Sequence, residues 1–64
     1  MKSILILGAG EMQVPIISKV KELGYSSIVV DANPNALGRS YANEFYTIST
    51  DDYDNILKIA LEKS

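Results

Sequence analysis

Two glycines and an aspartate have the types and spacing of a ligand-binding turn. Gly8 and Gly10 follow an apolar run, and Asp31 comes 21 residues after Gly10. Glycines after a strand permit a tight turn and a close approach of a ligand to the backbone, and an acid at this distance can accept a hydrogen bond from a ribose hydroxyl. The pattern indicates a ligand site, and the alternative is an ordinary tight turn between a strand and a helix.

Gln13 occupies the third glycine position of the dinucleotide pattern G-x-G-x-x-G. In dinucleotide-binding folds that glycine lets the helix pack closely against the strand. A glutamine here weakens the prediction of an NAD site. Two interpretations stay open on the residues themselves: a small NAD(P)-binding module that uses Gly8, Gly10 and Asp31, or a site for another ligand.

Further polar side chains lie near the turn and in the loop that follows the second apolar run. Glu11 repels phosphate but can accept hydrogen bonds from an amine or a sugar hydroxyl; it can equally be a solvated acid near a helix start. Asn33 follows Asp31 at the carboxyl edge of the predicted sheet, where open α/β sheets bind ligands, although an Asx turn explains it too. Arg39, in the same loop, is placed to meet a 2′-phosphate or is simply solvated.

The composition excludes several chemistries. The 64-residue chain has no cysteine and no histidine, so it offers no thiolate, disulfide or imidazole base. Its net charge of −2 gives no basis for nucleic-acid binding. No apolar run approaches the ~20 residues of a membrane span. Asp51, Asp52 and Asp54 suit a helix start and lack calcium-loop spacing, so we predict no metal site. We expect a cytoplasmic protein that binds neither nucleic acid nor membrane.

Strands and helices alternate along the sequence. We expect strands over 3–7, 27–31 and 44–48, a helix over 13–23, a short helical turn within 36–43, and a last helix that begins after Thr50 as N-cap and ends near 61. The first strand is an unbroken apolar run, which is typical of a strand with both faces buried. Pro15 is tolerated only in the first turn of a helix, so Glu11 stays in the preceding turn. Gly24 suits the helix end.

Apolar residues at helical spacing predict the buried face of each helix. The predicted faces are Ile16, Val20 and Leu23 with Ile17 beside them, and Tyr53, Leu57 and Ala60 with Ile56 beside them.

The resulting pattern is β-α-β-(α)-β-α, which predicts an α/β fold with a three-stranded parallel sheet, a partial Rossmann-like arrangement. A three-stranded sheet that ends on a helix looks truncated, so we expect residues 1–64 to form a single, incomplete domain. Because few helices are available to cover two apolar sheet faces, we expect one face to be exposed and the chain to self-associate. A non-catalytic interaction fragment is therefore a further alternative.

Three longer strings strengthen one interpretation. ILILGAGEMQ, IVVDANPNALG and RSYANEFYTIST, with the closing helix, resemble the N-terminal domain that precedes the ATP-grasp fold in carbamoyl phosphate synthase large subunits, biotin carboxylase and the formate-dependent glycinamide ribonucleotide transformylase. The resemblance covers essentially all 64 residues.

The resemblance implies the acceptor-substrate-binding segment of an ATP-dependent carboxylate–amine ligase, which is not catalytic alone. ATP and Mg would be bound mainly by the remaining ATP-grasp domains, and the small-molecule substrate would bear a carboxylate or phosphate. In the transformylase the Glu and Leu after the glycines contact the ribonucleotide, and they match Glu11 and Met12. Gln13 departs from that enzyme's next glycine, and carbamoyl-phosphate-synthase-like ligases match as well. The predicted substrate-binding set is Gly8, Gly10, Glu11, Met12, Gln13, Asp31 and Asn33, with no catalytic residue assigned.

Overall fold

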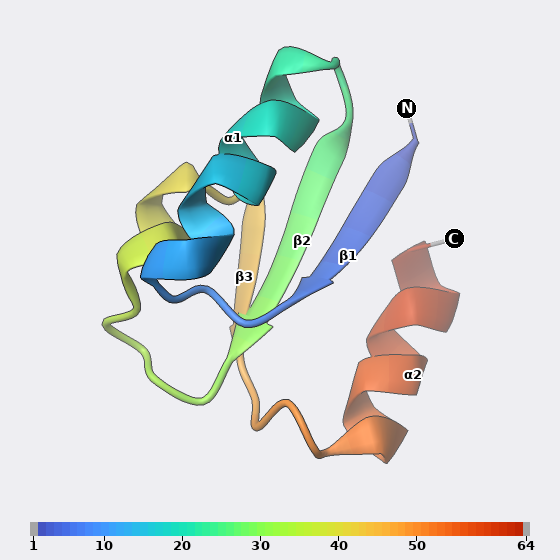
Figure 1. The fold of residues 1–64 in the computed structure, drawn as a ribbon. Helices are drawn as coiled ribbons and strands as arrows, with labels where there is room; N and C mark the ends of the chain where they lie inside the picture. The colour runs from blue at the N-terminus through green and yellow to red at the C-terminus, as the bar shows by residue number, and fades with distance from the viewer. Residues whose placement is uncertain (1, 64) are drawn as a thin grey trace.

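A computed structural model describes residues 2–63 as three parallel strands between helical layers (Figure 1). The strands are β1 (Ser3–Leu7), β2 (Ser26–Asp31) and β3 (Glu44–Thr47), in the order β1-β2-β3. The helical elements are the 3₁₀ turn η1 (Glu11–Gln13), α1 (Val14–Glu22), the 3₁₀ turn η2 (Leu37–Tyr41) and α2 (Tyr53–Lys63). The α/β class, the parallel three-stranded sheet and the element order are thus as predicted.

Both faces of the sheet are covered. Helix α1 and η2 lie on one face and α2 lies on the other (Figure 1). On the first face Ile17 and Val20 pack with Val29, and on the second Ile56 and Ile59 pack with Val30. The expectation of an exposed sheet face is therefore wrong, because α2 crosses to the side that α1 leaves open. Self-association, which rested on that expectation, stays a prediction.

The central strand is β2, and it carries the core. Its four middle residues are all buried, and Val29 and Val30 are 0% exposed. In β1 only Ile6 is buried, and Leu7 is 50% exposed. The prediction that β1 is buried on both faces holds in part: Ile4 and Ile6 pack into the core on the α1 side and Leu5 packs on the α2 side, but Ile4 and Leu5 are only half-buried and Leu7 is exposed.

Helix α1 begins and ends where its proline and glycine require. Pro15 is the second residue of α1, so it removes no hydrogen bond inside the helix. Gly24 has φ +85° just beyond the helix, and its N–H donates to the carbonyl of Lys21 over 3.0 Å. A left-handed residue here satisfies the last carbonyls of the helix.

The buried face of each helix agrees only in part with the predicted one, since Ile17, Val20 and Ile56 are buried as expected. In α1, Ile17 and Val20 are buried, whereas Ile16 and Leu23 are more than half exposed. In α2, Ile56 and Ile59 are buried, whereas Tyr53 and Leu57 are 73% and 58% exposed. The sequence of each helix offers two overlapping sets of apolar residues at helical spacing. Only one set packs against the sheet in the folded chain.

Thr50 is not the N-cap of the last helix. A polar turn comes first, in which the Asp52 N–H donates to the carbonyl of Ser49 over 3.0 Å and the Ser49 hydroxyl donates to the Asp51 carboxylate. These two bonds hold residues 49–52 in a turn that lies outside the helix. Helix α2 consequently begins at Tyr53, and the carbonyl of Asp52 accepts from the Ile56 N–H over 3.1 Å.

One buried polar group ties β2 to the residue before β3. Ser27 is 0% exposed, and its backbone N–H donates to Oδ1 of Asn43 over 2.9 Å. The Ser27 hydroxyl also accepts from the Asn43 N–H over 3.0 Å. The pair is satisfied internally, as a buried hydroxyl must be.

Candidate ligand-binding turn and its neighbouring groove

The turn after β1 is built by close backbone contacts. Gly8 has φ +93°, and its N–H donates to the carbonyl of Val30 over 2.7 Å, which extends the pairing of β1 with β2. Ala9 is completely buried, and its carbonyl accepts from the Gly38 N–H over 2.7 Å. The turn is therefore fixed both to the sheet and to η2.

Gly38 is required by this contact. A Cβ at Gly38 would lie 2.8 Å from the carbonyl oxygen of Ala9 and 2.8 Å from Cδ1 of Ile17. From the sequence alone we assigned no role to Gly38. The glycine at the end of DANPNALG could have indicated it, because glycine is typical of positions where two backbones approach closely.

Asp31 braces the glycine turn. Its Oδ2 accepts a hydrogen bond from the Ala9 N–H over 2.8 Å, and its Oδ1 accepts one from the Asn33 N–H over 2.8 Å. The bond from Asn33, followed by the bond from Ala9, lowers the pKa of the Asp31 carboxyl. The carboxylate therefore stays charged, and both of its oxygens are used within the fold.

Gln13 folds back over the two glycines. A Cβ built on Gly8 would lie 3.4 Å from Nε2 of Gln13, and one built on Gly10 would lie 3.3 Å from Oε1. The side-chain amide thus covers the surface where a dinucleotide-binding turn leaves the backbone open to pyrophosphate. The fold thus brings together four of the predicted site residues: Gly8, Gly10, Gln13 and Asp31.

Glu11 and Met12 lie on the outer side of this turn, in η1. Both are exposed, and Met12 is 82% exposed. Within residues 2–63 no side chain or backbone group donates a hydrogen bond to the Glu11 carboxylate. These two side chains are the groups that the turn presents to its surroundings.

The loop after β2 folds upon itself. Oδ1 of Asn33 accepts from the Asn35 N–H over 3.0 Å, which forms an Asx turn. Nη1 of Arg39 donates to the carbonyl of Pro34 over 2.6 Å, and its guanidinium lies 5.2 Å from the centre of the Phe45 ring. Arg39 is therefore held against its own loop and β3, with its side chain exposed at the surface.

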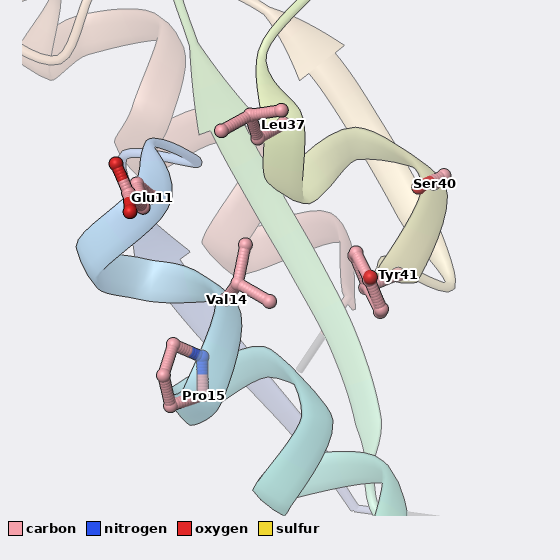
Figure 2. A pocket seen from close by; sticks show the side chains of 6 residues that line it. All are labelled: Glu11, Val14, Pro15, Leu37, Ser40 and Tyr41. Atoms are coloured by element: carbon pink, nitrogen blue, oxygen red, sulfur yellow. The ribbon is translucent and has the colours of Figure 1, made fainter.

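A groove opens beside the turn, between η1 and α1 on one side and η2 on the other (Figure 2). Its volume is about 550 Å³. The lining residues are Glu11, Val14, Pro15, Leu37, Ser40 and Tyr41. Of these, only Glu11 belonged to the predicted site; the helical spacing gave no sign that η2 would face α1.

The acidic side chains and the helices of residues 2–63 bear on metal ions and on membranes. No group of three or more acidic side chains comes together there in a way that could hold a metal ion. None of the helices within that range is long and apolar enough to cross a membrane.

Comparison with known proteins identifies relatives of this chain among curated sequences and among solved structures. No family model matches the chain. The chain is 32% identical over 60 residues to a formate-dependent phosphoribosylglycinamide formyltransferase from Rhodococcus jostii (strain RHA1). The matched region covers 94% of the chain and 15% of that enzyme.

The structure superimposes on N5-carboxyaminoimidazole synthetase from Staphylococcus aureus, solved in complex with ADP. The TM-score is 0.85 at 26% sequence identity, over 97% of the chain and 16% of that protein. The chain thus spans about a sixth of the length of either relative. Both relatives are ATP-grasp ligases, so the resemblance to this family that the sequence predicted is confirmed over nearly the whole chain.

Proposed function

We propose that this chain forms the N-terminal acceptor-substrate-binding segment of an ATP-dependent carboxylate–amine ligase. Two ligases of the ATP-grasp family match it over 94% and 97% of its residues. In this proposal the remaining domains of the ligase bind ATP and Mg, the enzyme is cytoplasmic, and residues 1–64 are one part of a larger domain.

The arrangement of Gln13 and Asp31 is the observation that carries the proposal. The Gln13 amide lies across Gly8 and Gly10, and the Asp31 carboxylate accepts the Ala9 N–H. A diphosphate would need this same surface. What remains for a ligand is the outer side of the turn, where Glu11 and Met12 are exposed. This supports an acceptor-binding wall over the alternative of an NAD(P)-binding module.

The chain's own part in such a reaction is to bind and orient. In a carboxylate–amine ligase ATP phosphorylates a carboxylate, and an amine then displaces the phosphate. We assign no phosphate-clamping residue to the turn, and Arg39 of the described residues is held by the carbonyl of Pro34 and the ring of Phe45. Holding the acceptor near its reaction partner lowers the entropic part of the barrier.

A chimeric enzyme tests the proposal. Residues 1–64 replace the matching segment of the Rhodococcus formyltransferase, and ATP-dependent formylation of phosphoribosylglycinamide is measured. We expect activity, and we expect Glu11→Gln to raise the KM for the acceptor severalfold while the KM for ATP changes little. A folded chimera that binds ATP but shows no acceptor-dependent turnover contradicts the proposal.

Two measurements on the 64-residue chain separate the alternatives. We expect no ATP hydrolysis by the chain alone, and turnover of ATP would contradict the proposed division of labour. Titration with NAD(H) and NADP(H) by calorimetry is expected to show no saturable binding. Micromolar binding would favour the dinucleotide-binding module instead.

A further inference from the structure

We propose that two copies of this chain associate through the outer edge of β1 and the flank of α2 beside it. In this dimer the two β1 strands pair antiparallel, and the two α2 helices pack against each other across the same two-fold axis. The inference goes beyond the proposed function and concerns the 64-residue chain by itself. It depends on an edge of the sheet, where the earlier expectation of self-association depended on an uncovered face.

The outer edge of β1 presents backbone groups to solvent. Within residues 2–63, β1 pairs with β2 only. The Lys2 carbonyl and the Gly8 N–H both bond to β2. Because the direction of the backbone groups alternates along a strand, the N–H and C=O groups of Ser3, Leu5 and Leu7 point away from β2. A further strand can bond to them.

Strand β1 lacks the features that keep an edge strand from pairing with another chain. Protected edges are short, or they carry a charge, a proline or a bulge. The sequence of β1, SILIL, has neither a charged residue nor a proline, and its register with β2 runs without a bulge. The opposite edge, β3, is shorter and carries Glu44, which is paired with Lys63. Of the two edges, β1 is therefore the one open to pairing.

An apolar stripe runs along one flank of α2. It consists of Tyr53, Leu57 and Leu61, which follow one another at the i, i+4 spacing of a single helix side. All three are more than half exposed, whereas Ile56 and Ile59 face the sheet and are buried. Burying such a stripe removes apolar surface from water, which favours association.

The stripe lies on the side of α2 that faces the β1 edge. Ala60, three residues after Leu57, lines a small cavity of about 180 Å³ together with Ser3 and Leu5 of β1. Figure 1 likewise shows α2 on the β1 side of the sheet, away from β3. The strand edge, with half-exposed Leu7, and the helix stripe are thus neighbours, and one partner can cover both.

An antiparallel arrangement matches the stripe with itself. With Leu57 on the two-fold axis, Leu57 lies opposite its own copy, and Tyr53 lies opposite Leu61 of the second copy. The same axis lets the two β1 strands pair around Leu5. A patch that is complementary to itself is what a closed two-fold dimer requires.

The charges of α2 favour the same orientation. Three acids lie at its start, and two lysines and one acid lie in its later turns: Asp51, Asp52, Asp54, Lys58, Lys63 and Glu62. Antiparallel helices place the start of one beside the end of the other, which brings opposite charges and opposite dipole ends together. Within residues 2–63, Asp54 and Lys58 make no ion pair, so both are free to pair with the second copy.

Sedimentation equilibrium of the 64-residue chain tests the association. Between about 10 μM and about 1 mM we expect the average mass to rise from 7.0 kDa toward twice that value, with a Kd on the order of 100 μM. Leu57→Lys places like charges opposite each other on the axis and is expected to raise the Kd at least tenfold. The control is Leu23→Lys, which changes a leucine of nearly equal exposure at the end of α1 and is expected to leave the Kd unchanged.

Circular dichroism shows whether both variants are folded. A wild-type chain that keeps the mass of one copy throughout this concentration range would overturn the proposal. Equal effects of Leu57→Lys and Leu23→Lys would overturn it as well, because the association would then not involve the α2 stripe.

Single cysteines test the orientation of the helices, since the chain contains none. On oxidation with glutathione disulfide, Leu57→Cys is expected to form a disulfide-linked dimer faster than Leu23→Cys. A mixture of Tyr53→Cys and Leu61→Cys chains is expected to crosslink faster than either chain alone, because antiparallel helices bring these two positions together. Faster crosslinking of Tyr53→Cys with itself than in the mixture would overturn the antiparallel arrangement.

Hydrogen exchange tests the pairing of β1. At about 1 mM, the amides of Leu5 and Leu7 are expected to exchange more slowly in the wild-type chain than in Leu57→Lys, whereas the amides of β3 exchange alike in both. Equal exchange at Leu5 and Leu7 in the two chains would overturn the strand pairing. The chimera tests the ligase proposal separately, so the failure of either proposal leaves the other standing.

Discussion

The backbone N–H of Ala9 donates a hydrogen bond to Oδ2 of Asp31 over 2.8 Å, which links the turn after β1 to the end of β2. The other oxygen of the same carboxylate accepts from the Asn33 N–H, also over 2.8 Å. One acidic side chain therefore holds two loops together at the carboxyl edge of the sheet. Its charge is needed for the strength of both bonds, because hydrogen bonds to ionised groups are the stronger ones.

Asp31→Asn is expected to lower the free energy of unfolding by about 1–2 kcal/mol at pH 7, since it weakens two charge-assisted hydrogen bonds. The bonds from Asn33 and Ala9 lower the pKa of Asp31 from its usual 3.8. The stabilisation is therefore fully present above about pH 4 and is lost as the pH falls through the lowered pKa. Urea denaturation at pH 7 and at pH 3 measures this.

The control for Asp31 is Asp54→Asn, which removes an exposed aspartate in the first turn of α2. Its cost at pH 7 is expected to stay below about 1 kcal/mol, the scale of a charge–dipole interaction. If Asp31→Asn is no more destabilising than this control, or if its effect is the same at both pH values, the bracing role is wrong.

Several features of the fold follow directly from local sequence. The strand Ser3–Leu7 lies where its apolar run predicts it, Pro15 and Gly24 fix the ends of α1, and a 3₁₀ turn fills the predicted helical stretch before β3. In each case the conformation is decided by interactions among a few neighbouring residues, so the local sequence is sufficient to predict it.

The features that were missed depend on contacts far apart in the chain. Asp31 was predicted as a ligand-binding acid, but its proximity to Ala9 gives it a structural role that no spacing rule contains. Gly38 meets Ala9 only because η2 packs against the turn. Tyr41 lines the groove beside Val14 and Pro15 for the same reason. The roles of all three residues thus depend on tertiary contacts, which local sequence patterns do not contain.

Gly38→Ala is expected to destabilise the chain by about 1–3 kcal/mol, because its Cβ would lie 2.8 Å from the carbonyl oxygen of Ala9 and from Cδ1 of Ile17. The backbone would have to shift, which would also displace the groove wall. Urea denaturation and the NMR shifts of the Ala9 amide measure the two effects.

The control for Gly38→Ala is Ser40→Ala, which changes an exposed residue in the same 3₁₀ turn. It adds no atoms and is expected to change the free energy of unfolding by less than about 0.5 kcal/mol. Wild-type stability and an unshifted Ala9 amide in Gly38→Ala would show that the close approach of these backbones is not required.

The ion pair between Glu44 and Lys63 joins β3 to the last turn of α2, with a distance of 2.8 Å from Nζ to Oε1. The hydrogen bond from Lys63 is the largest cause that lowers the pKa of Glu44, and the hydrogen bond to Glu44 is the largest that raises the pKa of Lys63. The pair therefore stabilises between the usual pKa values of 4.5 and 10.5. Its contribution is lost as the pH falls through the lowered pKa of Glu44 or rises through the raised pKa of Lys63.

Lys63→Gln is expected to bring the pKa of Glu44 back toward its usual value and to speed amide exchange in the last turn of α2. NMR titration of the Glu44 side chain and hydrogen exchange at neutral pH measure both. Because the pair is exposed, added salt should reduce the difference from wild type. Lys58→Gln, on the same helix, should leave the Glu44 titration unchanged; an equal response to both variants would rule out a specific pair.

Two apolar truncations test which face of α2 packs against the sheet. Ile59 is 7% exposed and packs with Ile28 and Val30, whereas Leu57 is 58% exposed. Ile59→Ala is expected to cost about 2–4 kcal/mol, from lost burial and the cavity left behind. Leu57→Ala is expected to cost less than about 1 kcal/mol.

Urea denaturation followed by circular dichroism compares the two variants. If Ile59→Ala does not fold, Ile59→Val takes its place, with an expected cost of about 0.5–1.5 kcal/mol. A larger loss at Leu57 than at Ile59 would mean that the helix packs on the face predicted from apolar spacing, with Tyr53 and Leu57 inward.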